Sequence, residues 1–196
     1  GDGYTLLLAS DAVFTLNQHL YSKIPYDPVK DFVPVSRLVT ANLMMVARPK
    51  LPANTVGELI DYARKNPGKV TYGSVGAGGV NHLGMAGFAT QNGLALEHIP
   101  YKGLVQGLQD VGEERVDVMF AVIGGAAPLL NGGKLKGLAV SGRARNPLVP
   151  NVPTFKEVGV ANFEVLNVTG LVGPAGMAPQ VVARLHAATL KALADP

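Results

Sequence analysis

The sequence of 196 residues contains no cysteine, which excludes disulfide bonds and cysteine-ligated metal sites. Charged residues make up only 16% of the chain and hydrophobic residues 47%, a balance typical of a globular protein and not of a disordered one. No apolar run approaches the length of a membrane span; the longest, such as residues 43–47, suit buried strands. The length allows one domain or two small ones with a buried core.

Aromatic residues are absent between Phe120 and Phe155, a stretch that contains the one concentrated source of positive charge in the chain. Binding of single-stranded nucleic acid would need aromatic side chains on which bases stack. We therefore predict no nucleic-acid partner. Phosphate binding is the sharper interpretation of this stretch and a solvated basic face the plainer one, which we prefer; its cations are Lys134, Lys136, Arg143 and Arg145.

Metal-ligating and catalytic patterns are also missing. The four histidines, at positions 19, 82, 98 and 186, show no i,i+4 pair on a predicted helix, so we predict no metal site. Glu97 and His98 are adjacent in a predicted strand, where neighbouring side chains point to opposite faces, so they do not form an acid–base couple. We predict neither enzymatic activity nor a cofactor.

The most informative segment is glycine-rich and spans residues 73–79, between a short β-type run and a helical pattern that begins near Val80. Glycines allow backbone N–H groups to converge on one point, because no Cβ blocks the approach. The first turn of the following helix adds unpaired N–H groups and the positive end of its dipole. The segment is therefore predicted to bind an anion.

Three known glycine motifs do not fit this segment. A P-loop needs a lysine and a hydroxyl residue after its last glycine, whereas Val80 and Asn81 follow Gly79. The dinucleotide fingerprint, counted from Gly76 and Gly78, has Asn81 where its third glycine belongs. A nucleophile elbow has glycine two residues before its serine, a position held by Tyr72. The segment is predicted to hold an anion without reacting with it.

Individual residues near this segment have two interpretations each. Ser74 is either a nucleophile or, as we prefer, the N-cap of the following helix. His82 lies in the first turns of that helix, where it either contacts the anion or packs against neighbours. Asp11, at the end of a predicted strand, either binds an ammonium group or forms a turn. Asp117 is expected to cap or pair at a strand start.

Strand and helix patterns alternate through most of the chain, which predicts an α/β fold with a parallel sheet and helices on both faces. Residues 4–9 are predicted to be a buried strand, and residues 33–39 and 43–46 two strands broken at 40–42. Thr55 and Glu58 form a capping box that opens a helix. The other predicted strands are 70–72, 95–99, 116–122, 135–141 and 163–172, and the other predicted helices 80–90, 103–111, 125–130, 155–158 and one starting at Pro179.

In such sheets, ligands gather beyond the carboxyl ends of the strands. The residues predicted there are small, hydroxyl-bearing or glycine-rich, which suits a compact polar ligand held by backbone donors. They are Ser10–Asp11, Gly73–Ser74, Pro100–Tyr101, Ile123–Gly125 and Ser141.

A series of short strings along the whole chain resembles one family, the Bug (TctC-like) extracytoplasmic solute receptors of tripartite tricarboxylate transporters. No single string is diagnostic, but their order and spacing are specific. They include residues 2–7, 24–28, 30–35, 55–60, 66–69, 72–76, 82–83, 100–103, 116–120, 133–136, 138–140 and 152–154.

The resemblance implies a fold like that of type II periplasmic binding proteins, with two lobes of mixed and parallel sheets that close on a ligand about a hinge. Residues 43–162 are expected to form the second lobe, which carries the glycine-rich segment. Residues 1–42 and 163–196 are expected to form a first lobe that lacks its usual N-terminal part. Exposed strand edges of this incomplete lobe are expected to favour self-association.

The resemblance also implies a function without covalent chemistry. The protein is expected to be exported to the periplasm, to capture a small organic carboxylate and to deliver it to integral-membrane permease subunits; the ligand class spans dicarboxylates, tricarboxylates, amino acids and aromatic acids. An α/β enzyme that binds a nucleotide cofactor at residues 73–82 is the alternative. The predicted ligand-binding residues are Ser10, Asp11, Gly73, Ser74, Val75, Gly76, His82, Ile123 and Gly124.

Overall fold

The computed structural model describes residues 2–160 and 163–195, which divide into two compact units. Unit 1 comprises Gly1–Thr40 and Asn167–Pro196, and unit 2 comprises Ala41–Leu166. The sequence placed the boundaries at 42/43 and 162/163, and residues 1, 161, 162 and 196 lie outside the described residues.

The sheet of unit 2 is mixed, and its strands follow the order β6-β2-β5-β3-β4. Strands β3, β4 and β5 are parallel to one another, whereas β2 runs antiparallel to both β5 and β6. The predicted α/β fold with mixed and parallel pairing is confirmed. The strand bounds are Phe32–Ala47 for β2, Val70–Ser74 for β3, Leu96–Pro100 for β4, Val118–Val122 for β5 and Lys136–Val140 for β6.

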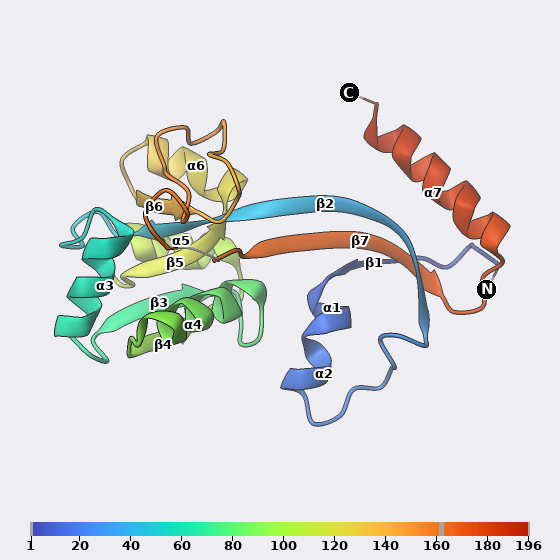
Figure 1. Ribbon diagram of the computed structural model, residues 1–196, viewed down its shortest axis with the longest axis horizontal. Helices are drawn as coiled ribbons and strands as arrows, with labels where there is room; N and C mark the ends of the chain where they lie inside the picture. Colours follow the sequence, from blue (N-terminus) through green and yellow to red (C-terminus); the bar gives the residue numbers. More distant parts are fainter. Residues whose placement is uncertain (1, 161–162, 196) are drawn as a thin grey trace. The chain divides into compact units, whose positions relative to one another are not determined.

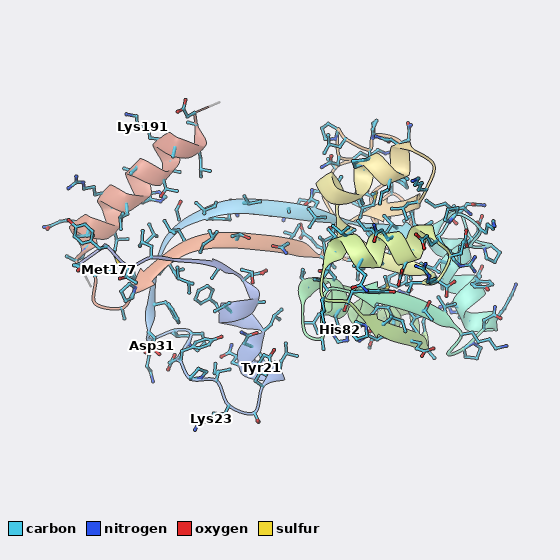
Figure 2. The ribbon with its side chains drawn as sticks, turned by 180° about the vertical axis from the view of Figure 1, so that it is seen from behind. Tyr21, Lys23, Asp31, His82, Met177 and Lys191 are labelled. Carbon is cyan, nitrogen blue, oxygen red and sulfur yellow. The ribbon has the colours of Figure 1, made fainter. Side chains whose placement is uncertain are left out.

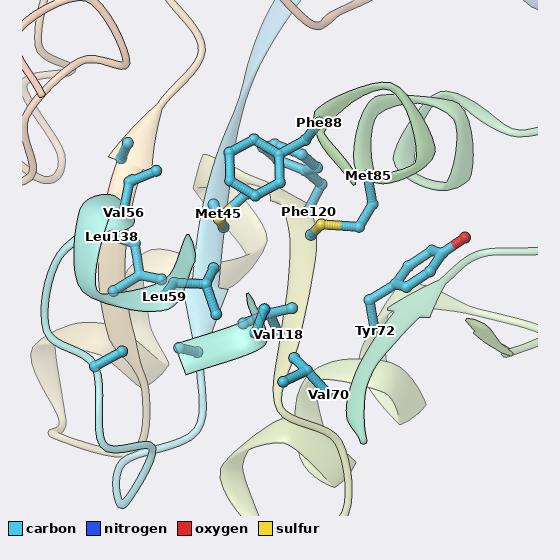
Figure 3. Close-up of a cluster of buried hydrophobic side chains, with 14 of the residues drawn as sticks. Met45, Val56, Leu59, Val70, Tyr72, Met85, Phe88, Val118, Phe120 and Leu138 are labelled. Carbon is cyan, nitrogen blue, oxygen red and sulfur yellow. The ribbon is translucent and has the colours of Figure 1, made fainter. Parts of the chain in front are cut away.

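Helices cover both faces of this sheet, as the strand–helix alternation predicts (Figure 1). Successive side chains of a strand point to opposite faces. Met45 and Phe120 therefore pack with α3 (Val56–Lys65) and α4 (Val80–Asn92), as the cluster in Figure 3 shows. Their neighbours Met44 and Met119 pack on the other face with α5 (Leu104–Gly112) and α6 (Ile123–Asn131). This two-sided core fixes the ends of β3, β4 and β5.

The first turn of α3 has the predicted cap. Thr55 Oγ1 accepts a hydrogen bond from the Glu58 N–H at 3.1 Å, and a Glu58 carboxylate oxygen accepts one from the Asn54 N–H at 2.6 Å. Thr55 is therefore confirmed as the N-cap, whereas the Glu58 carboxylate bonds to the N–H of the residue before the N-cap and not to that of Thr55 itself.

Unit 1 contains β1 (Leu7–Ser10), the short helices α1 (Ala12–Thr15) and α2 (Asn17–Leu20), the first part of β2, β7 (Leu166–Pro174) and α7 (Pro179–Leu193). Strand β1 pairs antiparallel with β7, which lies beside β2. No described residue of α7 is buried, although its apolar positions recur at helical spacing.

Three predictions about local structure are wrong. Residues 4–9 are not a buried strand: Leu6, Leu7 and Leu8 are exposed and only Ala9 is buried, because β1 pairs with β7 alone. Strand β2 runs unbroken through residues 40–42, since the hydrogen bonds of the sheet override the local signal. Residues 155–159 form turns and not a helix.

Candidate functional site

The carboxyl ends of β3, β4 and β5 meet at one edge of the unit 2 sheet, because the three strands are parallel. Strand β3 ends at Ser74, and five loop residues separate it from the start of α4 at Val80. The Tyr101 N–H, just after β4, donates to the Ser74 carbonyl at 2.8 Å. Helix α6 begins directly after β5, at Ile123. We call residues 75–79 the glycine loop.

Two residues of the glycine loop adopt the left-handed conformation that favours glycine. Gly76 has φ +95° and Gly78 has φ +81°. A Cβ placed on Gly76 would meet no atom within 4 Å, so the loop is open at this point. The N-cap of α4 is Gly79, and no side chain caps it.

Most amides of the loop are unpaired. In the described part of the chain, the N–H groups of Val75, Gly76, Ala77 and Gly79 donate to no protein acceptor. The exception is the Gly78 N–H, which donates to the Nδ1 atom of His82 at 3.1 Å. Unpaired amides next to a helix N-terminus attract anions.

Ser74 is fully buried, and its hydroxyl makes two hydrogen bonds. Oγ donates to the Gly76 carbonyl at 3.0 Å and lies 2.6 Å from His98 Nε2. A hydroxyl has a single proton, so His98 must donate its Nε2–H to Oγ when that proton is given to Gly76. His98 is therefore no general base toward Ser74. The preferred N-cap interpretation of Ser74 is wrong, since the N-cap of α4 is Gly79, five residues further on.

Three aromatic rings pack together next to Ser74 and the glycine loop: Tyr72 is stacked with both histidines, and the two histidine rings are tilted relative to each other. The ring of His98 lies 4.9 Å from that of Tyr72 and 4.2 Å from that of His82. Tyr72 and His98 face each other because they are register partners on parallel strands. Burial, followed by the charge of His82, lowers the pKa of His98. Figure 3 shows the Tyr72 hydroxyl pointing away from the buried cluster.

His98 was rejected as a partner of Glu97 for a sound reason, because Glu97 is exposed while His98 is half-buried. The contact between His98 and Ser74 was not predicted from the sequence. The signal that could have found it is the parallel register of β3 and β4, which pairs Tyr72 with His98 and Ser74 with Pro100.

Helix α4 holds His82 in place through two neighbours of this histidine (Figure 2 labels His82). The buried Asn81 side chain donates to the Phe120 carbonyl of β5 at 2.6 Å. Gly84 lies so close to Val165 that a Cβ would be 2.9 Å from its side chain. Asn81 is thus a tether between helix and sheet, at the position where the dinucleotide fingerprint needs a glycine.

The residues predicted after β5 have different surroundings. Ile123 is buried in the core, whereas Gly124 is exposed and a Cβ on it would meet nothing within 4 Å. No side chain caps the N-terminus of α6. Next to this edge, burial and the Asp110 carboxylate raise the pKa of Tyr101 to about 12, so its hydroxyl remains a neutral donor to Asp110.

Ser10 and Asp11 belong to unit 1. Ser10 is the last residue of β1 and the register partner of Thr169. The Asp11 carboxylate accepts a hydrogen bond from the Ala12 N–H and caps α1, in agreement with the turn interpretation. The ligand-binding roles of both residues stay predictions.

Other charged groups have partners away from the glycine loop. Arg48 donates to Asp117 at 2.6 Å and to Glu114 at 2.9 Å, which confirms that Asp117 pairs at a strand start. Two cations of the basic stretch have partners of their own, since Lys136 donates to the Leu51 carbonyl and Arg145 to Glu157. A cavity of about 420 Å³ follows β6; its lining includes Arg143, Lys156 and Glu164 and no glycine-loop residue.

Two features are absent from the described residues. Within residues 2–160 and 163–195, no group of three or more histidine, aspartate or glutamate side chains could hold a metal ion. No helix in the same ranges is long and apolar enough to cross a membrane.

Comparisons with known proteins agree on one family. The model of the tripartite tricarboxylate transporter family receptor matches residues 1–196. A curated relative from Bordetella pertussis is 36% identical over 195 residues, which cover 100% of this chain and 60% of the relative. The chain thus spans about three fifths of the length of the curated relatives it matches.

Three solved structures share the fold at more than 30% identity. The structure of Rpa4515 from R. palustris with adipate has a TM-score of 0.86 at 31% identity, covering 96% of this chain and 63% of that one. The structure of the periplasmic binding protein BugD has a TM-score of 0.86 at 33% identity, covering 100% of this chain and 65% of that one. The structure of MatC from Rhodopseudomonas palustris with bound malate has a TM-score of 0.82 at 31% identity, covering 97% of this chain and 65% of that one.

Proposed function

This chain belongs to the tripartite tricarboxylate transporter receptor family, and from that premise we propose that it forms part of a receptor that captures a small organic carboxylate at the glycine loop. The similar structures with adipate and malate contain dicarboxylates, which makes this class our first choice of ligand. The proposal assigns no chemical step to the protein, because the Ser74 hydroxyl has no general base.

The observation that carries the proposal is the set of unpaired amides in the glycine loop. Val75, Gly76, Ala77 and Gly79 offer N–H groups within five consecutive residues, beside the positive end of α4. A carboxylate has about four acceptor sites on two oxygens and suits such a cluster of donors. Charge-assisted bonds of this kind are stronger than those between neutral groups.

Each predicted ligand-binding residue of unit 2 receives a role under this proposal. Val75 and Gly76 contribute amides, the Ser74 hydroxyl holds the loop through the Gly76 carbonyl, and Gly73 allows the end of β3 to pack closely against Met119. Gly124 leaves room for the ligand, while Ile123 anchors the start of α6 in the core. His82 adjoins the loop through Gly78.

Ser10 and Asp11 are proposed to contact the ligand from unit 1, as the family resemblance implies. We also propose that the whole protein is exported to the periplasm and passes its ligand to integral-membrane permease subunits. The support for both is family membership and the likeness to the periplasmic protein BugD. The nucleotide-enzyme alternative finds no support in these comparisons, and Asn81 occupies the place of its third glycine.

The test combines ligand identification with a matched pair of variants. Native mass spectrometry of the freshly purified protein should reveal a retained organic acid, and a thermal-shift screen should rank malate, adipate and related acids. An acid at about a hundredfold excess over its Kd should stabilise the protein by about 2.7 kcal/mol. Stabilisation by nucleotides alone would refute the proposal.

Calorimetry with the best acid should then locate the site. Gly76→Val adds a branched Cβ at φ +95°, which strains the loop and fills its open side, so affinity should fall about tenfold or more. Gly68→Val is the control, since Gly68 also has positive φ (+72°) and free space but lies before β3. Equal affinities in the two variants would place the ligand elsewhere.

A further inference from the structure

The side chain of His82 already occupies one amide of the glycine loop. Its Nδ1 accepts the Gly78 N–H at 3.1 Å, whereas the neighbouring loop amides are unpaired in the described residues. An imidazole nitrogen that accepts a hydrogen bond carries no proton, so the ring is neutral with its proton on Nε2. In the free protein, His82 thus takes the place that one carboxylate oxygen of a ligand would take.

Protonation of His82 would reverse this arrangement. An imidazolium donates from both nitrogens, so it cannot accept from the Gly78 N–H. The amide would be released to a ligand, and a positive charge would appear beside the loop. A carboxylate bound to the amide would in turn favour the charged ring. Proton and anion therefore each promote the binding of the other.

The surroundings of His82 determine which histidine takes the proton. Two titratable groups face its ring: His98 from β4 at 4.2 Å and Tyr72 from β3 at 6.2 Å. Two imidazolium rings at that separation would repel each other, and burial, followed by the charge that His82 carries when it is protonated, lowers the pKa of His98. In the described part of the chain no carboxylate bonds to either ring. His82 is the ring adjoining the amides, and we assign the proton to it.

We propose that His82 holds the place of the ligand on the Gly78 amide and takes up a proton when a carboxylate displaces it, so that capture of the acid is coupled to proton uptake. The inference rests on the proposed function, because it needs an anion at the glycine loop. It makes His82 a residue that sets the pH dependence of affinity and not only a packing residue.

Calorimetric titration of the protein with malate and with adipate, in buffers of different ionisation enthalpy, measures the protons taken up on binding. The wild type should take up at most about one proton per acid, and over the pH range in which it does so Kd should rise with pH by at most about tenfold per unit. His82→Asn keeps an acceptor for the Gly78 N–H but cannot take up the proton. It should bind with no proton uptake and a flat pH profile.

His186→Asn is the matched control, because this histidine bonds to the Val35 carbonyl in unit 1 and should leave proton uptake unchanged. Binding without proton uptake in the wild type, or equal uptake in His82→Asn, would overturn the inference while leaving the proposed function intact. If neither acid binds, the proposed function fails for these two probes, and the free protein still tests His82.

That second test follows the Gly78 amide by NMR during a pH titration without ligand. Its chemical shift should move together with the ring resonances of His82, and its exchange with water should accelerate as the ring gains a proton. The His82→Asn variant should show neither change. If the Gly78 amide of the wild type shows no change in chemical shift or exchange when His82 is protonated, the proposed role of the bond between Gly78 and His82 is refuted.

Discussion

Replacement of Ser74 by alanine tests whether this hydroxyl supports the glycine loop from below. Ser74 is fully buried, and its Oγ makes two hydrogen bonds, to the Gly76 carbonyl at 3.0 Å and with His98 Nε2 at 2.6 Å. Each bond of this kind contributes about 0.5–1.5 kcal/mol net, and a buried partner left unsatisfied adds about 1–3 kcal/mol. The partners here are only part-buried, so water recovers some of that second contribution.

Ser74→Ala should lower the free energy of unfolding by about 2–3 kcal/mol. This value adds the loss of two hydrogen bonds to the part of the desolvation penalty that water does not recover. Urea denaturation followed by circular dichroism measures it. Ser36→Ala is the matched control, because Ser36 is also buried but its hydroxyl makes only a 3.4 Å bond to the Arg37 carbonyl. That variant should lose less than about 1 kcal/mol.

A double-mutant cycle assigns the loss to the Ser74–His98 contact. The double variant should lose about 1 kcal/mol less in the free energy of unfolding than the sum of the losses in Ser74→Ala and His98→Phe, because both substitutions remove the same hydrogen bond. A Ser74→Ala variant as stable as the wild type, or no coupling with His98, would refute the supporting role.

Three further predictions concern other parts of the chain. Burial, followed by the charge of His82, lowers the pKa of His98 from 6.5 in the folded state. The stability that this histidine contributes is therefore present above pH 6.5 and is lost as the pH falls through the pKa of the folded state. Denaturation at several pH values should show this dependence, and His98→Gln should remove it. Replacing the four cations of the basic stretch by glutamine should leave the affinity for the acid nearly unchanged in calorimetry, because Lys136 and Arg145 bond to the Leu51 carbonyl and to Glu157 and not to the glycine loop. A large loss of affinity would mean that these cations line the site or steer the anion into it. The exposed leucines of β1 and the unpaired edge of this strand should cause the protein to self-associate in light scattering, and a monomer at all concentrations tested would contradict this role of the β1 edge.

The sequence predicted unit 2 well because local patterns and packing agree there. Alternation of Leu43, Met44, Met45 and Val46 between two helical layers is the pattern of a buried strand, and the glycine loop follows from composition alone. Unit 1 was predicted poorly, since burial depends on what covers a strand. Leu8 has the composition of a core residue and is 62% exposed.

Within the site, the backbone features were predictable and the side-chain contacts were not. The positive φ of Gly76 follows from its place in a tight loop. The hydrogen bond between Ser74 and His98 joins residues 24 positions apart through the register of β3 and β4, which no local pattern encodes. The same holds for the stack of Tyr72, His82 and His98.

The central claim is that loop amides hold the carboxylate, and NMR tests it most directly. Titration of the ¹⁵N-labelled protein with malate or adipate should produce the largest amide shifts at Val75, Gly76, Ala77, Gly78 and Gly79, with smaller shifts at the start of α6. Shifts centred instead on Arg143 and Lys156, which line the separate cavity beyond β6, would contradict the account.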